Sequence, residues 1–173
     1  KRNDMRPALV EKDFWVCWVL LKLFEHQRLS SKILFKGGTS LSKVFRLVER
    51  FSEDIDLILE WRLLTEAKPD AKRSRTQQDD LNEKILLKAN DYLRKDLLPS
   101  VKEAVEAYCQ AEIDENDEDV IQIRYPGGFK DPYLRPDIRL EIGPLAGWIP
   151  HAEYAIVPYA AEEFPHLFSF AQC

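Results

Sequence analysis

The stretch FKGGTSLSKVFRLVERFSEDIDLIL (Phe35–Leu59) carries the local signals that decide the fold. It begins at the end of a short apolar run, which Gly37-Gly38 interrupts in a way that is typical of a turn. The pair Thr39-Ser40 can then cap a helix whose apolar residues recur at spacings of three and four. Asp54–Leu59 is predicted to be a strand. The stretch therefore predicts strand, turn, helix and strand in succession.

Helical patterns dominate the segments on either side. Apolar residues at spacings of three and four predict a helix over residues 7–28, apolar enough to be buried on most sides. Residues 62–79 are polar and predict a surface loop. A long amphipathic helix is expected after them, kinked or split at Pro99 and running to about residue 111.

Strand patterns return in the second half. The acidic stretch 112–119 predicts a solvated connector, and the alternation in 120–125 predicts a strand. A turn and a partner strand over 133–142 would complete a hairpin, and 154–157 predicts a further short strand. The whole order favours an α+β domain with a small mixed sheet, flanking helices and a helical insert.

Composition limits the class of protein. The chain has 173 residues, 45% of them hydrophobic, which suffices for one globular domain with a core. A formal net charge of −5 disfavours a DNA-coating protein but leaves room for an enzyme that binds phosphates through metal ions. The longest apolar run, Phe14–Leu21, is far shorter than the ~20 residues of a membrane span. With no disulfide framework and no signal peptide, we expect a cytoplasmic protein without membrane contact.

Asp54 and Asp56 lie in an otherwise apolar strand. Residues two apart in a strand point to the same face, so both carboxylates should project together. Removing two close carboxylates from water is costly unless a positive charge lies between them. Oxygen ligands of this kind suit Mg²⁺ or Mn²⁺. The alternative is that the two aspartates form the polar edge of a half-solvated strand.

The glycine turn before the predicted helix suits a phosphate. Gly37 and Gly38 would let a ligand approach the backbone closely, and Thr39 and Ser40 stand where the first N–H groups of a helix are free. The sequence matches neither of the commoner glycine loops, G-x-x-x-x-G-K-[ST] and G-x-G-x-x-G. Together with the aspartates, this turn predicts a nucleotide-transfer site.

A third carboxylate is expected for two-metal phosphoryl chemistry. In RPDIRLEIG, Asp137, Arg139 and Glu141 share one face of the predicted strand. Glu141 is the better candidate because its neighbours are apolar, as those of Asp56 are. Asp137 is the reserve candidate, and Glu141 could instead form a salt bridge with Arg139.

These residues resemble a known family. The turn G-G-[ST] followed by D-h-D, where h is apolar, is similar to the first motif of minimal nucleotidyltransferases of the DNA polymerase β superfamily. The stretches EKDFWVCWVLLKLF, FKGGTSLSKVF and RFSEDIDL resemble the AbiEii/AbiGii toxins of type IV abortive-infection toxin–antitoxin systems. The resemblance is good over residues 8–60 and looser over RPDIRLEIG.

The resemblance implies a nucleotidyltransferase that binds an NTP with Mg²⁺ and modifies an acceptor, for which transfer-RNA ends are a plausible class. It implies phosphate contacts from the glycine turn, metal binding by Asp54 and Asp56, and a third acid at Glu141 that helps to activate the attacking hydroxyl. Lys36, Lys43 and Arg50 are further candidates for phosphate contacts. A cognate antitoxin is an expected partner. Because family members continue into a C-terminal helical domain, we expect residues 1–173 to form the nucleotidyltransferase-like domain without it.

Two other functions fit the same residues. One is a catalytically silent relative that acts as a protein-interaction module, for example on an antitoxin. The other is a metal-dependent phosphohydrolase or nuclease that uses the same acids. An extended acceptor with released pyrophosphate would indicate transfer, whereas shortened nucleic acid would indicate cleavage.

Overall fold

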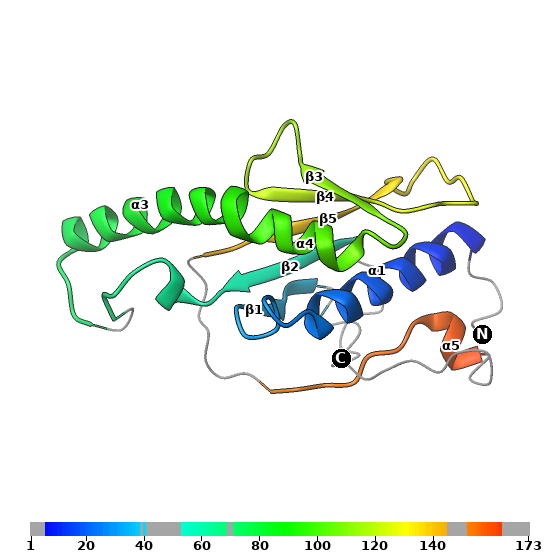
Figure 1. The fold of residues 1–173 in the computed structure, drawn as a ribbon, viewed down its shortest axis with the longest axis horizontal. Helices are drawn as coiled ribbons and strands as arrows, with labels where there is room; N and C mark the ends of the chain where they lie inside the picture. The colour runs from blue at the N-terminus through cyan, green and yellow to red at the C-terminus, as the bar shows by residue number, and fades with distance from the viewer. Residues whose placement is uncertain (1–5, 39, 41–52, 69–70, 145–151, 164–173) are drawn as a thin grey trace.

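A computed structural model describes residues 6–38, 40, 53–68, 71–144 and 152–163 (Figure 1). Its centre is a five-stranded sheet in the order β1-β2-β5-β4-β3. The strands are β1 (Ile33–Lys36), β2 (Asp54–Leu59), β3 (Gln110–Ile113), β4 (Val120–Arg124) and β5 (Asp137–Ile142). β2 and β5 run parallel, while the other three neighbouring pairs are antiparallel. The predicted α+β class with a mixed sheet is confirmed.

Helix α1 (Pro7–Glu25) packs against the sheet as the apolar pattern predicts. Pro7 occupies the first turn, where its missing N–H costs no hydrogen bond. The helix ends three residues before the predicted position 28 because His26 leaves the helical conformation, with ψ at 118°. The N–H groups of Leu29 and Ser30 then bond to the His26 carbonyl in a turn that leads into β1.

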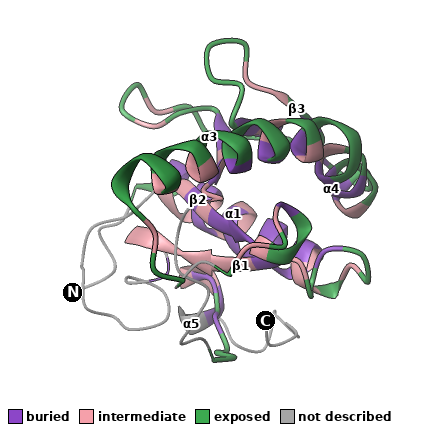
Figure 2. Cartoon of the chain, turned by 90° about the vertical axis from the view of Figure 1, so that its left-hand side faces the viewer, coloured by how far each residue is buried: buried purple, intermediate pink, exposed green. Residues whose placement is uncertain are grey.

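The core lies between the sheet and the helices on one of its faces (Figure 2). Ile55 and Leu57 of β2 are fully buried there, as are Ile138 and Leu140 of β5. The same cluster includes side chains of α1 and α4, whereas most of α3 is exposed. The opposite face of β2 and β5 carries their polar residues, so the fold gives the sheet one apolar and one polar side.

The helical insert differs from its prediction at both ends. Helix α3 (Arg75–Tyr92) begins inside the predicted loop because Ser74 and Gln77 form a reciprocal capping box. A short 3-10 helix, η1 (Trp61–Leu63), also lies within the predicted loop. After α3, one π-helical turn, η2 (Leu93–Leu97), leads into α4 (Leu98–Val105), with Pro99 in its first turn. The predicted break near the proline is confirmed.

The predicted helix end near residue 111 is wrong. α4 ends at Val105, and Gln110–Ile113 forms β3 at the edge of the sheet. Only Ala111 of this strand is buried, so its alternation is too weak to recognise beside the acidic residues that follow. Pairing with β4 supplies the long-range contacts that local sequence does not show.

Two other strand predictions need correction. The strand predicted over 133–142 begins at Asp137, because residues 131–134 form a turn in which Asp131 accepts the Tyr133 N–H at 2.9 Å. Residues 154–157 are not a strand, although Ile156 is buried in the core. Helix α5 (Tyr159–Glu163) follows them. Most of the helix predicted after the glycine turn lies outside the described residues. Within the described ranges, no helix combines the length and apolar character needed to cross a membrane.

Candidate active site

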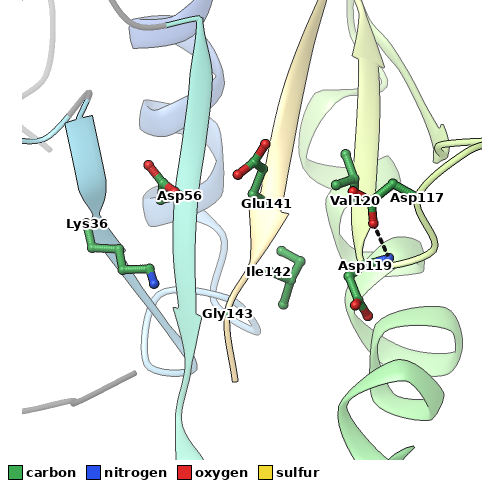
Figure 3. Close-up of a pocket in the computed structure, with 8 residues that line it drawn as sticks. All are labelled: Lys36, Asp56, Asp117, Asp119, Val120, Glu141, Ile142 and Gly143. Atoms are coloured by element: carbon green, nitrogen blue, oxygen red, sulfur yellow. Dashed lines mark hydrogen bonds between the residues drawn. The ribbon is translucent and has the colours of Figure 1, made fainter. Parts of the chain in front are cut away.

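The parallel pair β2–β5 brings the predicted acids together. Asp56 stands opposite Glu141 in the register of the two strands, and Asp54 stands opposite Arg139. Because residues two apart share a face, Asp54, Asp56 and Glu141 all lie on the polar side of the sheet. Neighbouring strands are about 4.8 Å apart, so the Asp56 and Glu141 side chains are close neighbours (Figure 3).

The glycine turn lies directly against the side chain of Asp56. Gly37 has φ of +75°, a conformation that side chains with a Cβ rarely adopt, and a Cβ at this position would overlap the Asp56 carboxylate. The backbone N–H of Gly38 donates a hydrogen bond to Asp56. The turn therefore holds the carboxylate in place and leaves no room for a larger residue at position 37.

The helix after the turn starts earlier than the sequence suggests. Helical structure already includes Gly37 and Gly38, so the helix start expected after a cap at Thr39 or Ser40 comes about one turn too late. Ser40 is buried, and its hydroxyl donates to the Gly37 carbonyl at 2.9 Å, which closes the turn on itself. Thr39, Lys43 and Arg50 lie outside the described residues, and their predicted phosphate contacts stay predictions.

Negative charge accumulates on this face of the sheet. The pKa of Asp56 is raised mainly by burial and further by the Asp54 charge, while the Lys36 ammonium and the Gly38 N–H oppose this rise. The pKa of Glu141 is also raised, first by burial and then by Asp54 and Asp56, with Arg139 acting in the opposite direction. Burial, and then the neighbouring carboxylates, thus disfavour the charged form of each group, which is the situation that a bound cation relieves.

An open cavity of about 280 Å³ lies over Asp56 and Glu141, whereas Asp54 is not among the residues that line it. Its lining includes four carboxylates, from Asp56, Glu141, Asp117 and Asp119, and the ammonium of Lys36 (Figure 3). Asp117 and Asp119 come from the turn between β3 and β4, which the sequence indicated only as a solvated connector. No local pattern places them here, because the turn reaches the site only through the pairing of β4 with β5.

The position of each residue on β5 distinguishes Glu141 from Asp137, the reserve candidate for the third acid. Asp137 lies four residues earlier on β5, about 13 Å away along the strand. It is buried and accepts a hydrogen bond from the Gln122 amide, and it does not line the cavity. Arg139 bonds to Asp114 and Asp117 at 3.4 and 3.3 Å, while its Nε lies 3.7 Å from Glu141. Glu141 is therefore the acid beside Asp56.

The donor set is compatible with Mg²⁺. Asp56 and Glu141 offer hard oxygen ligands side by side, and Mg²⁺ is usually held by one or two carboxylates together with waters and substrate phosphates. Across the described residues, no group of three or more histidine, cysteine or acidic side chains is arranged to hold a metal ion by itself. The arrangement thus fits an ion that a nucleotide helps to complete better than a metal enclosed by protein ligands alone.

Comparison with known proteins identifies the family. The model of the family described as "Nucleotidyl transferase AbiEii toxin, Type IV TA system" matches residues 18–171. The chain belongs to the AbiEii family. The match includes the glycine turn and all five strands, and it confirms the resemblance that the sequence motifs indicated. This AbiEii protein is accordingly a nucleotidyltransferase toxin of the type IV toxin–antitoxin class, for which an antitoxin is the implied partner. Searches of curated proteins and of solved structures found no match.

Proposed function

We propose that this AbiEii protein transfers a nucleotide from an NTP to an acceptor hydroxyl, using Mg²⁺ or Mn²⁺ held by Asp54, Asp56 and Glu141. The observation that supports it best is the register that places Glu141 beside Asp56, with the glycine turn in contact with the same carboxylate. A bound divalent ion would neutralise charge on the transferring phosphate.

The chain's own residues supply positioning and charge. Asp56 is oriented by the Gly38 N–H, and the nearby ammonium of Lys36 is suited to contact the triphosphate. Gly37, Gly38, Thr39 and Ser40 form the proposed phosphate-binding turn, with Lys43 and Arg50 as further phosphate contacts. Glu141 would accept the proton of the attacking hydroxyl. For the acceptor we propose RNA with a free terminal hydroxyl, with transfer-RNA ends first.

Thermal unfolding with each NTP, with and without Mg²⁺, tests nucleotide binding. A ligand at about 100 times its dissociation constant stabilises the folded protein by about 2.7 kcal/mol. We expect a metal-dependent rise in Tm for the parent and none for Asp54→Asn/Asp56→Asn. A parent that responds to no NTP in the presence of metal contradicts the proposal and favours the protein-interaction module.

Product analysis tests the reaction itself. Labelled NTP and a pool of transfer RNA should give an extended acceptor and pyrophosphate, whereas shortened RNA would indicate the nuclease alternative. Glu141→Gln should lower the rate of transfer at least 100-fold if this residue is the third acid. Asp137→Asn is the matched control on the same strand and should retain most of the activity. The opposite ranking would assign the role to Asp137.

A further inference from the structure

Lys12 of α1 is fully buried, which is unusual for a lysine. Its ammonium forms an ion pair with Glu53 and donates a hydrogen bond to the Arg135 carbonyl at 2.9 Å. Glu53 in turn accepts the backbone N–H of Arg135 at 2.8 Å. Lys12, Glu53 and the Arg135 backbone thus form a closed set of contacts, here called the strand lock.

The strand lock joins the starting points of two strands. Glu53 directly precedes β2, and Arg135 stands two residues before β5. These are the parallel strands that carry Asp54, Asp56 and Glu141. The contact between them is direct, through the Glu53 side chain, and both ends are tied to the same lysine on α1.

The property that the strand lock can control is the register of β2 against β5. Asp56 faces Glu141 only in the observed pairing of β2 with β5. A shift of one residue would place a strand's side chains on the opposite face and separate the carboxylates. The two strands are not joined by a short loop, because the whole helical insert, β3 and β4 lie between them in the chain. No local turn therefore sets their register.

The neighbours of Lys12 anchor other segments. Glu11 accepts the N–H groups of Gly128 and Phe129 at 2.7 and 3.0 Å, and Asp13 accepts the Tyr159 N–H at 2.6 Å. Those contacts hold the loop after β4 and the start of α5. The contacts of Lys12 differ because both of its partners stand at the starts of the site strands.

We infer that Lys12 and Glu53 are positioning residues of the active site, which set the register of β2 against β5 and thereby the spacing between Asp56 and Glu141. The part of this inference that concerns metal binding rests on the proposed function. The strand lock itself is tested without any ligand.

The first experiment is hydrogen–deuterium exchange on the intact chain. Lys12→Met leaves the partly buried Glu53 without its cation, so the peptides covering 53–59 and 135–142 should exchange at least about tenfold faster. Peptides of α3 should change much less. Lys22→Met is the matched control, since Lys22 lies on the same helix and pairs with Glu25 at the surface. Equal exchange in Lys12→Met and Lys22→Met would overturn the strand lock.

The second experiment separates positioning from stability. Replacing both charges in Lys12→Met/Glu53→Met should recover most of the Tm lost in Lys12→Met, because the partly buried Glu53 charge no longer stands without its partner. Manganese binding is then measured by electron paramagnetic resonance at a temperature where all variants are folded. We expect the double variant to bind Mn²⁺ at least about tenfold more weakly than the parent, corresponding to about 1.4 kcal/mol.

The outcomes are distinguishable. A double variant that regains both Tm and parental Mn²⁺ affinity shows a merely structural ion pair and overturns the inference. Loss of Mn²⁺ affinity despite recovered Tm supports it. If the parent itself fails to bind Mn²⁺, the proposed metal site fails, and faster exchange confined to the two strands still supports the strand lock.

Discussion

Gly37 brings the backbone so close to the carboxylate of Asp56 that a Cβ would overlap it. Its positive φ and the lack of space beside the Asp56 carboxylate both exclude a methyl group. We expect Gly37→Ala to lower the free energy of unfolding by about 1–3 kcal/mol and to displace Asp56, so that the NTP-dependent rise in Tm is lost.

Gly127→Ala is the control for this prediction. A Cβ there would lie 3.4 Å from the Tyr125 ring, which is ordinary contact, and the position requires no positive φ. Urea unfolding and the NTP-dependent Tm of both variants check the prediction. Gly37→Ala with parental values in both measurements would show that the turn relaxes without moving the carboxylate.

Lys36 opposes the negative charge of the cavity, so its removal should have opposite effects on two ligands. Lys36 pairs in register with Asp56 and lowers the pKa of that carboxyl group against the effect of burial. Lys36→Met should therefore strengthen Mn²⁺ binding in the absence of nucleotide and weaken ATP binding in its presence, each by roughly 1 kcal/mol. Isothermal titration calorimetry measures both, with the exposed Lys84→Met on α3 as control. Changes of the same sign would refute the proposed triphosphate contact.

At the scale of single elements, α3 is a helix with its own N-terminal stabilisation. The Ser74 hydroxyl accepts the Gln77 N–H, and the Gln77 side chain accepts the Ser74 N–H. Ser74→Ala should reduce the free energy of unfolding by about 1 kcal/mol, because it leaves helix N–H groups without a partner. Since α3 does not line the cavity, Mn²⁺ and NTP affinities should equal those of the parent. Urea unfolding and calorimetry check this, and a fall in either affinity would show that the insert is coupled to the site.

Sequence patterns predict those elements whose signals are local. β2 was predicted with its observed bounds because Asp54–Leu59 combines an apolar run with two aspartates on one face. The break near Pro99 follows from the lost N–H of proline. The sequence does not predict β3, because this edge strand has only one buried residue and forms through its pairing with β4. The start of β5 was misplaced because turn contacts of Asp131 compete with the strand pattern.

The same distinction applies to the site. Asp54, Asp56 and Glu141 could be proposed from spacing, since strand periodicity places side chains on faces. Asp117 and Asp119 could not, because they reach the cavity from a turn whose position depends on the sheet order. Lys12 could not either: a lysine inside an apolar helix gives no sign of which distant carboxylate it meets. Its partner Glu53 lies 41 positions away in the chain.

At the scale of the whole molecule, alkaline unfolding reports on Tyr125. Burial, and the charges of Glu11, Asp137 and Glu53, raise the pKa of Tyr125 from its ordinary value near 10 to about 12. The folded protein therefore keeps this phenol neutral where the unfolded chain ionises it. Stability from this effect is complete below pH 10 and is lost as pH rises towards 12.

Tyr125→Phe tests this dependence because it keeps the ring that stacks on Trp15. Between pH 10 and 12, the free energy of unfolding should fall less steeply in Tyr125→Phe than in the parent. Urea unfolding across this pH range measures the slopes, and Tyr108→Phe, at an exposed tyrosine, is the control. Parallel slopes for parent and Tyr125→Phe would contradict the shifted pKa.

The parallel pairing of β2 with β5 has a consequence for synthesis on the ribosome. Asp56 is made early, whereas its partner Glu141 follows only after the insert and the β3–β4 pair have been translated. A nascent chain that has not yet released β5 from the exit tunnel holds an incomplete carboxylate set. Under the proposed mechanism, the toxin cannot act while most of its own domain is still being made, and a translation product cut short before β5 is harmless.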